Sequence, residues 1–214
     1  VGLPGKNTIA FVDVKGAENF NSANDDVDAY VLLDNYKIDD TKTVGIYLVR
    51  VNDPQGKLFI GAGAPSGSEA NLDNIGLWFN GKLGPINLQA ELDFEMGKVS
   101  PGGGGTESKF KGNQIVLQGN MPIDPLSINI GLARGTGSKA GDTDIKNYIP
   151  VLDSDPHYTV VYEYFSKTAC GLKNSGFCNT TALNLGAGMK VGKSLDVNLD
   201  YWYLKAVEKV ALNG

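Results

Sequence analysis

The sequence predicts an all-β chain that forms an antiparallel, up-and-down transmembrane β-barrel. Glycine is abundant, at 28 of 214 residues, and helical periodicity is hard to find. Several stretches alternate between apolar and polar side chains over the ~10 residues that a tilted barrel strand needs. Hydrophobic residues make up 42% of the chain, which argues against disorder. No stretch approaches the ~18 consecutive apolar residues of a membrane-spanning helix, but strands of a β-barrel do not need such a run.

Charge excludes one class of partner. The formal net charge is -5, from 19 basic and 24 acidic residues. A nucleic-acid-binding surface would need clustered Lys and Arg, so no nucleic-acid partner is expected. Arg50 and Arg134 are the only arginines, which argues against dense recognition of phosphate or carboxylate groups.

The first sixty residues predict four strands. DVDAYVLLDNYKI (26–38) places Val27, Ala29, Val31 and Leu33 opposite polar neighbours that include Asp34. TVGIYLVRVND (43–53) is apolar on both faces, so its orientation is left open. TIAFVDVKG (8–16) and LFIGAG (58–63) are further predicted strands with a weaker pattern.

Three hairpins follow, each with a short turn. Their strands are IGLWFNGKLG (75–84) with INLQAELDFEMGKV (86–99), NQIVLQGN (113–120) with LSINIGLARG (126–135), and TTALNLGAGMKV (180–191) with SLDVNLDYWYLKA (194–206). The connections 100–113 and 135–157 and the cysteine loop are long and polar. Short turns on one rim and long loops on the other are typical of an outer-membrane barrel. YTVVYEYFSKT (158–168) is either part of the long outer loop or a strand whose partner is not identified.

The alternation assigns one face to lipid and one to water. Residues 88, 90, 92, 94 and 96 are apolar, and aromatic residues near strand ends (Tyr201, Tyr203, Phe94 and the 158–165 group) fit interfacial girdles. The predicted pore-lining side chains are Asn80, Lys82, Asn87, Gln89, Glu91, Asp93, Glu95, Asn184, Lys190, Asp196, Asn198 and Asp200. Alternation alone also fits a soluble antiparallel sheet with one wet face.

Cys170 and Cys178 lie in CGLKNSGFC, a loop rich in Gly, Asn and Ser. Two thiols in such a loop predict a short disulfide in an oxidising compartment. A metal pair is less favoured, because no second Cys or His pair completes a site.

No enzyme, metal or cofactor is expected. Glu91, Asp93 and Glu95 are interpreted either as residues that set cation preference in a pore or as ordinary polar lining. They are also spaced like a glycosidase carboxylate pair, but so are the acids of many solvated strands. His157 is the only histidine, and DTDIKN (142–147) and DSDPH (153–157) are weak calcium candidates beside solvated loop acids.

Residues 75–206 resemble the alginate-export-like family of bacterial outer-membrane porins. The segments that carry the resemblance are FKGNQIVLQGNMPIDPLSINIGLARGTGS, YIPVLDSDPHYT and LNLGAGMKVGKSLDVNLDYWYLKA. Family members typically show a strand that ends in a Gly/Ser-rich loop, an aromatic-rich segment with a His, and a closing hairpin. The resemblance implies a monomeric barrel of about eighteen strands. We therefore expect residues 1–214 to form one barrel domain or a fragment of a larger barrel.

These observations predict a porin-like channel in the bacterial outer membrane. Its partners would be the lipid bilayer and small hydrophilic solutes or polysaccharide, which would pass through a polar, mainly acidic lumen. One alternative is a secreted soluble β-domain that binds glycan or protein. Another is a non-conducting barrel that sheathes a partner protein.

Overall fold

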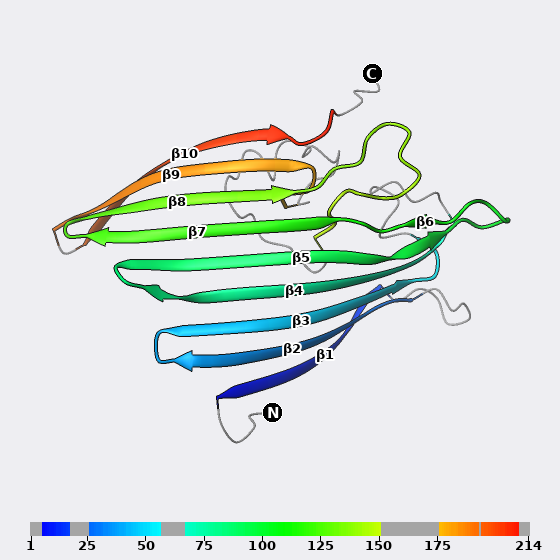
Figure 1. The fold of residues 1–214 in the computed structure, drawn as a ribbon, viewed down its shortest axis with the longest axis horizontal. Helices are drawn as coiled ribbons and strands as arrows, with labels where there is room; N and C mark the ends of the chain where they lie inside the picture. The colour runs from blue at the N-terminus through cyan, green and yellow to red at the C-terminus, as the bar shows by residue number, and fades with distance from the viewer. Residues whose placement is uncertain (1–5, 18–25, 57–66, 151–175, 193, 210–214) are drawn as a thin grey trace.

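The computed structural model describes residues 6–17, 26–56, 67–150, 176–192 and 194–209. Within these ranges the chain is all-β and forms one antiparallel sheet (Figure 1). The strands are β1 (Asn7–Ala17), β2 (Val27–Asp39), β3 (Lys42–Asp53), β4 (Glu69–Leu83), β5 (Ile86–Ser100), β6 (Ser108–Lys109), β7 (Asn113–Ile123), β8 (Leu126–Gly135), β9 (Thr180–Val191) and β10 (Leu195–Ala206). None of the described residues belongs to a helix that is long and apolar enough to cross a membrane.

The sheet has up-and-down topology. Each main strand pairs with the next one along the chain, in the order β1-β2-β3-β4-β5-β7-β8-β9-β10, and the two-residue β6 pairs with β5. Among the described residues, β1 and β10 each pair on one side only, so the sheet is open. The predicted all-β antiparallel arrangement is confirmed at this level.

Short turns lie at one end of the sheet and long connections at the other, as Figure 1 shows. The predicted short turns after Leu83, Ile123 and Val191 are confirmed. The structure adds a fourth, between β2 and β3, where the Asp39 carboxylate accepts hydrogen bonds from the Thr41 amide at 2.8 Å and the Lys42 ammonium at 2.8 Å. The predicted segments 58–63 and 158–168 lie outside the described residues.

The two faces of the sheet differ in chemistry. The apolar face is the one on which the strand register places Leu77, Leu92, Leu132, Leu185 and Tyr201. The polar face is the opposite one, and the strand register places on it Asn80, Gln89, Gln118, Asn184 and Asp200.

In β2 and β3 both faces are largely apolar, which explains why the sequence left the orientation of β3 open. Val27 and Ala29 lie on the polar-face side of the sheet and are buried. Leu32 and Tyr36 project from the apolar face and are exposed. The alternation between apolar and polar side chains is therefore weaker in β2 and β3 than in the later hairpins.

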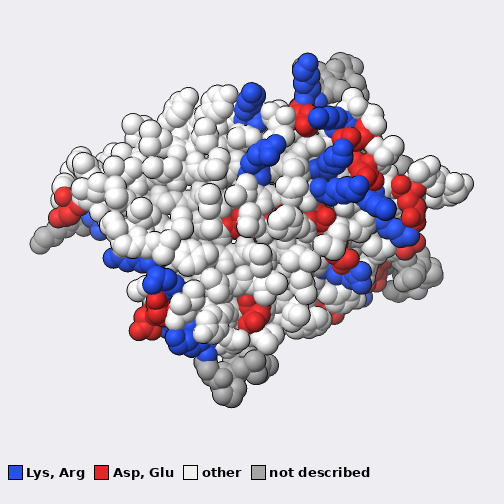
Figure 2. Space-filling view, in the orientation of Figure 1, with Lys and Arg blue, Asp and Glu red and all other residues white. Residues whose placement is uncertain are grey.

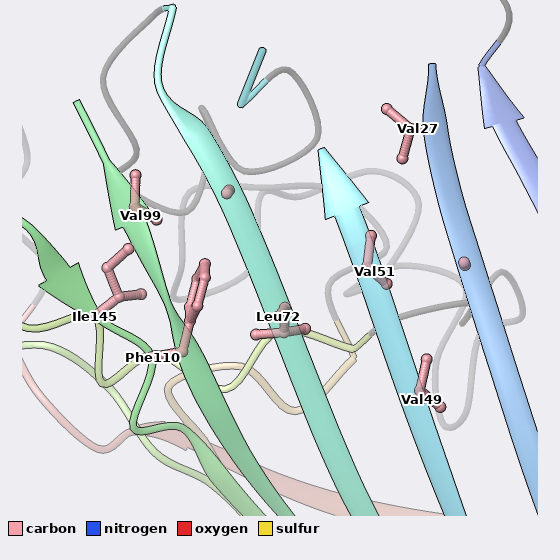
Figure 3. Close-up of a cluster of buried hydrophobic side chains, with 9 residues drawn as sticks. Val27, Val49, Val51, Leu72, Val99, Phe110 and Ile145 are labelled. Atoms are coloured by element: carbon pink, nitrogen blue, oxygen red, sulfur yellow. The ribbon is translucent and has the colours of Figure 1, made fainter. Parts of the chain in front are cut away.

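A hydrophobic core covers the long-connection end of the polar face. Figure 3 shows side chains from β2, β3, β4 and β5 gathered with two from the connections, Phe110 and Ile145. The buried members are Val27, Ala29, Val49, Val51, Ala70, Leu72, Val99, Phe110 and Ile145. A second cluster joins Ala133 and Ala182 to Phe177. Toward the short turns no described residue forms such a cover, and the polar face is lined there by polar side chains.

Candidate functional site on the polar face

Side-chain amides line the open part of the polar face. Asn80, Gln89 and Gln118 are cross-strand neighbours in one row. In the next row the Asn87 amide nitrogen donates to Asn120 Oδ1 at 3.3 Å, and the Asn120 amide nitrogen donates to Asn129 Oδ1 at 2.7 Å. These groups offer both donors and acceptors to water and to polar solutes.

Two hollows lie along this amide surface. One has a volume of about 330 Å³ and is lined by residues that include Trp78, Glu91 and Gln114. The other, also about 330 Å³, lies nearer the short turns and its lining includes Asn184 and Trp202. Each combines an aromatic ring with amide or carboxylate groups, a lining that suits hydrated small molecules.

Two aromatic rings lie flat on glycines of the neighbouring strand. Tyr47 faces Gly76, where an added Cβ would lie 2.0 Å from the ring carbon Cζ. Trp78 faces Gly45, where an added Cβ would lie 2.2 Å from Nε1. The missing side chains leave room for both rings against the sheet, and this packing directs the Tyr47 hydroxyl toward the acids of β5.

The acids of β5 form a hydrogen-bonded cluster. The Tyr47 hydroxyl bonds to Glu91 Oε1 at 2.6 Å and also contacts the Asp93 carboxylate. Asp93 accepts further bonds from the Asn74 amide at 3.1 Å and the Gln114 amide at 3.3 Å. Donors from β3, β4 and β7 therefore surround one buried carboxylate, as burial of such a group requires.

Glu95 anchors the 136–150 segment, the part of the β8–β9 connection that folds over the polar face. Its Oε1 accepts a hydrogen bond from the Ile149 amide at 2.8 Å. Its Oε2 is buried without a hydrogen-bond partner among the described residues and lies beside Gly112, where an added Cβ would be 2.0 Å from it. Tyr148, next to Ile149, is also buried.

Backbone bonds fix the same segment at two further points. Ile145 forms an isolated parallel bridge with Phe110, in which the Ile145 amide donates to the Lys109 carbonyl at 2.9 Å and the Lys111 amide donates to the Ile145 carbonyl at 2.8 Å. The Thr136 amide donates to the Asn113 carbonyl at 3.0 Å, and within the segment the Tyr148 amide donates to the Thr136 carbonyl at 3.0 Å. The segment is therefore a fixed cover over the β5 acids.

The predicted wet environment of two β5 acids is wrong. Asp93 is 0% exposed and Glu95 is 5% exposed, because the 136–150 segment and the Tyr47 ring cover them. Glu91 lies at the edge of the cover and is half-buried. Three carboxylates on one strand thus divide into two buried structural groups and one that borders the open surface.

The other predicted pore-lining residues share the polar face, as their alternation indicated. The strand register places on it Asn80, Lys82, Asn87, Gln89, Asn184, Lys190, Asp196, Asn198 and Asp200. Eight of them are exposed and Asn184 is half-buried. A pore-lining role for this set stays a prediction.

Sequence reasoning missed Tyr47, Asn74, Gln114 and Tyr148. Tyr47 lies in a strand with two apolar faces, so its direction had no local signal. Gly45 and Gly76 could have indicated that direction, since a glycine opposite an aromatic residue marks a place where a ring covers the neighbouring strand. Tyr148 comes from a connection whose path over the sheet depends on contacts distant in sequence.

The loop acids of the calcium candidate are engaged by lysines. Asp142 pairs with Lys146 at 2.7 Å and Asp144 with Lys111 at 2.6 Å. These ammonium groups hold the pKa of each carboxyl below its usual range. Across the described ranges no cluster of three His, Cys, Asp or Glu side chains is arranged to hold a metal ion. Residues 153–157, with His157, lie outside the described residues.

Cys178 is disulfide-bonded. The sequence holds two cysteines, and the other, Cys170, lies outside the described residues. Cys178 is buried next to Phe177, whose side chain packs against Ala133 and Ala182. The bond therefore adjoins the second hydrophobic cluster, where the long connection rejoins β9.

No protein-family model matches this sequence, and a search of curated proteins finds no significant match. The chemical contrast between the two faces of the sheet is therefore the observation that points to a function.

Proposed function

We propose that the chain forms part of the wall of a porin-type β-barrel in the bacterial outer membrane, along whose polar face small hydrophilic solutes pass. The observation that carries the proposal is the contrast between the two faces of one sheet. Among the described residues, one face is apolar and exposed, and the opposite face is lined by amides and carboxylates.

The uncovered apolar face supports contact with lipid. Its most exposed side chains include Leu199 at 77%, Tyr201 at 67% and Ile130 at 61%. Figure 2 shows a broad area with few charged residues, in which isolated acidic groups appear, while most charged side chains gather toward the ends of the strands. Soluble monomers rarely expose a contiguous apolar patch larger than a few hundred Å². Hydrocarbon is the partner for which such a surface carries no cost.

The extent of the apolar surface also fits a membrane. On β9 it runs from Leu183 to Val191, and the paired residues of β10 run from Tyr203 to Leu195. Eight residue steps at ~3.3 Å span about 26 Å along the strand, which is about 20 Å of depth at a tilt of ~40°. The apolar band of outer-membrane barrels is ~25 Å tall.

Lipid sets a further requirement at the sheet edges. Hydrocarbon cannot hydrogen-bond to backbone groups, so spanning strands must be paired on both sides. In the proposed barrel the free edges of β1 and β10 pair with each other or with further strands.

The charge of the polar face bears on the solute. Lys82 and Lys190 are the exposed cations that the predicted lining contributes, beside Glu91, Asp196 and Asp200. A conduit for a polyanion would present rows of Lys and Arg to it. Neutral or cationic small solutes therefore fit this face better than alginate does.

Conductance of the full-length protein in a planar bilayer, under a salt gradient, tests the channel. We expect discrete steps and a reversal potential that favours cations. The double variant Asp196→Asn/Asp200→Asn should move that potential toward zero. The control Asp13→Asn/Asp28→Asn removes two acids from the apolar face and should leave the reversal potential unchanged.

Two results would contradict the channel. A protein that stays in solution without detergent would favour the soluble binding domain. A protein that inserts and never conducts would favour the barrel that sheathes a partner.

A further inference from the structure

The apolar face ends in cations at its long-connection end. Leu132, Leu183 and Tyr203 form an apolar row across β8, β9 and β10. Two residues further along these strands the matching row holds Arg134 and Lys205 on either side of Thr181. At ~3.3 Å per residue the backbone positions of Arg134 and Lys205 lie about 7 Å beyond the last apolar row.

Lysines carry further positive charge toward the same end of β5 and β6, where Lys98 lies six residues along β5 beyond Leu92, the residue in the row of Arg134. Lys109 of β6 is the cross-strand partner of Lys98 of β5. Lys111 lies two residues beyond Lys109, with the buried Phe110 between them directed to the opposite side. Figure 2 shows basic side chains clustered in this part of the molecule.

Acidic neighbours neutralise only part of this positive charge. Lys98 pairs with Glu107 at 2.5 Å and Lys111 with Asp144 at 2.6 Å. Within the described residues Lys109, Arg134 and Lys205 are exposed and have no ion pair. We call these three residues the cationic strip. It is an excess of positive charge on a chain whose formal net charge is -5.

We propose that the cationic strip binds the phosphate groups of anionic lipid headgroups at the loop-side surface of the membrane. Lys and Arg at the edge of an apolar surface extend their charged ends toward headgroups while their stems stay among apolar side chains. Phosphate is the anion that both side chains bind well, Arg through its paired N–H groups. The inference rests on the proposed function, since it requires the apolar face to be in lipid.

Placement favours lipid over a soluble polyanion as the occupant. The strip lies on the apolar face and continues the row of Leu132 and Tyr203. A solute that moves along the polar face does not meet it. A headgroup whose acyl chains cover Leu132, Leu183 and Tyr203 has its phosphate at the level of Arg134 and Lys205.

The test measures lipid selectivity of the full-length protein in phosphatidylcholine vesicles. Spin-labelled phosphatidylglycerol and spin-labelled phosphatidylcholine are compared by the fraction that the protein immobilises. Each cation near an anionic surface contributes roughly fivefold in association. We expect the wild type to prefer phosphatidylglycerol by about tenfold or more, and the preference to weaken at about 1 M salt.

The variant K109Q/R134Q/K205Q should immobilise both lipids equally. The control K6Q/K82Q/K190Q removes the same charge from positions outside the strip and should keep the wild-type preference. A wild type that immobilises both lipids equally, or a preference that survives the strip variant, would overturn the inference and leave the proposed function standing. A wild type that immobilises neither lipid would contradict the proposed function itself.

Discussion

Asp34 is the residue that fits the lipid-facing surface least. It projects from the apolar face between Leu32 and Tyr36, and its row neighbours on β1 and β3 are Ile9 and Ile46. Its Oδ1 is buried and finds no hydrogen-bond partner in the part of the chain that the structure describes. A carboxylate in hydrocarbon is unfavourable, so a substitution at this position distinguishes a lipid environment from an aqueous one.

Replacing Asp34 with Leu should therefore stabilise the protein in lipid. Charged groups at mid-bilayer positions on barrel strands cost ~2–4 kcal/mol for Lys and Arg and less for Asp, so we expect a gain of about 1 kcal/mol. The measurement is the urea midpoint of folding into lipid vesicles.

Asp196→Leu is the matched control, because Asp196 is exposed on the polar face. It should bring no gain. If water covered the apolar face, the Asp34 carboxylate would keep its hydration there, and replacing it with Leu should bring no gain in stability.

At the scale of elements, the 136–150 segment converts part of the polar face from a wet surface into a buried one. It depends on a close approach between β5 and the start of β7. Gly112 permits that approach, because a Cβ there would lie 2.0 Å from Glu95 Oε2 and 2.8 Å from the Asn147 carbonyl oxygen. The cover and the buried acids are therefore coupled through one glycine.

Gly112→Ala should displace the 136–150 segment and expose the β5 acids. We expect the free energy of unfolding to fall by about 1–3 kcal/mol, the usual cost of overpacking. We also expect faster amide exchange at Ile145, Tyr148 and Ile149. Hydrogen exchange followed by mass spectrometry measures both the loss of stability and the residues at which it occurs.

Gly119→Ala serves as the control, since a Cβ at Gly119 would have its nearest neighbour at 3.6 Å. It should leave exchange in the segment unchanged. Equal exchange in the two variants would show that the segment is not held at Gly112.

At the scale of the whole molecule, alternation predicted most of the sheet. In β4, β5 and β7–β10 the strands, their short turns and the side of each residue follow from local pattern, because the side-chain period of a strand is two. Pattern did not reveal which polar residues a connection covers. Asp93, Glu95 and Glu91 have the same alternation pattern in the sequence. Their exposure differs only because the 136–150 segment covers Asp93 and Glu95. In β3 two apolar faces removed the signal for direction, and in β2 the apolar set that includes Val27 and Ala29 lies on the polar-face side of the sheet.

In the proposed barrel the apolar face of this sheet lies in lipid and the polar face in water. Nitroxide labels at single cysteines from Leu88 to Leu92 in β5, in the full-length protein reconstituted in vesicles, test it most directly. Oxygen, which concentrates in hydrocarbon, should reach labels at Leu88, Ala90 and Leu92. A water-soluble nickel chelate should reach those at Gln89 and Glu91. A chelate that reaches Leu88, Ala90 and Leu92 as readily as Gln89 would place both faces in water and contradict the account.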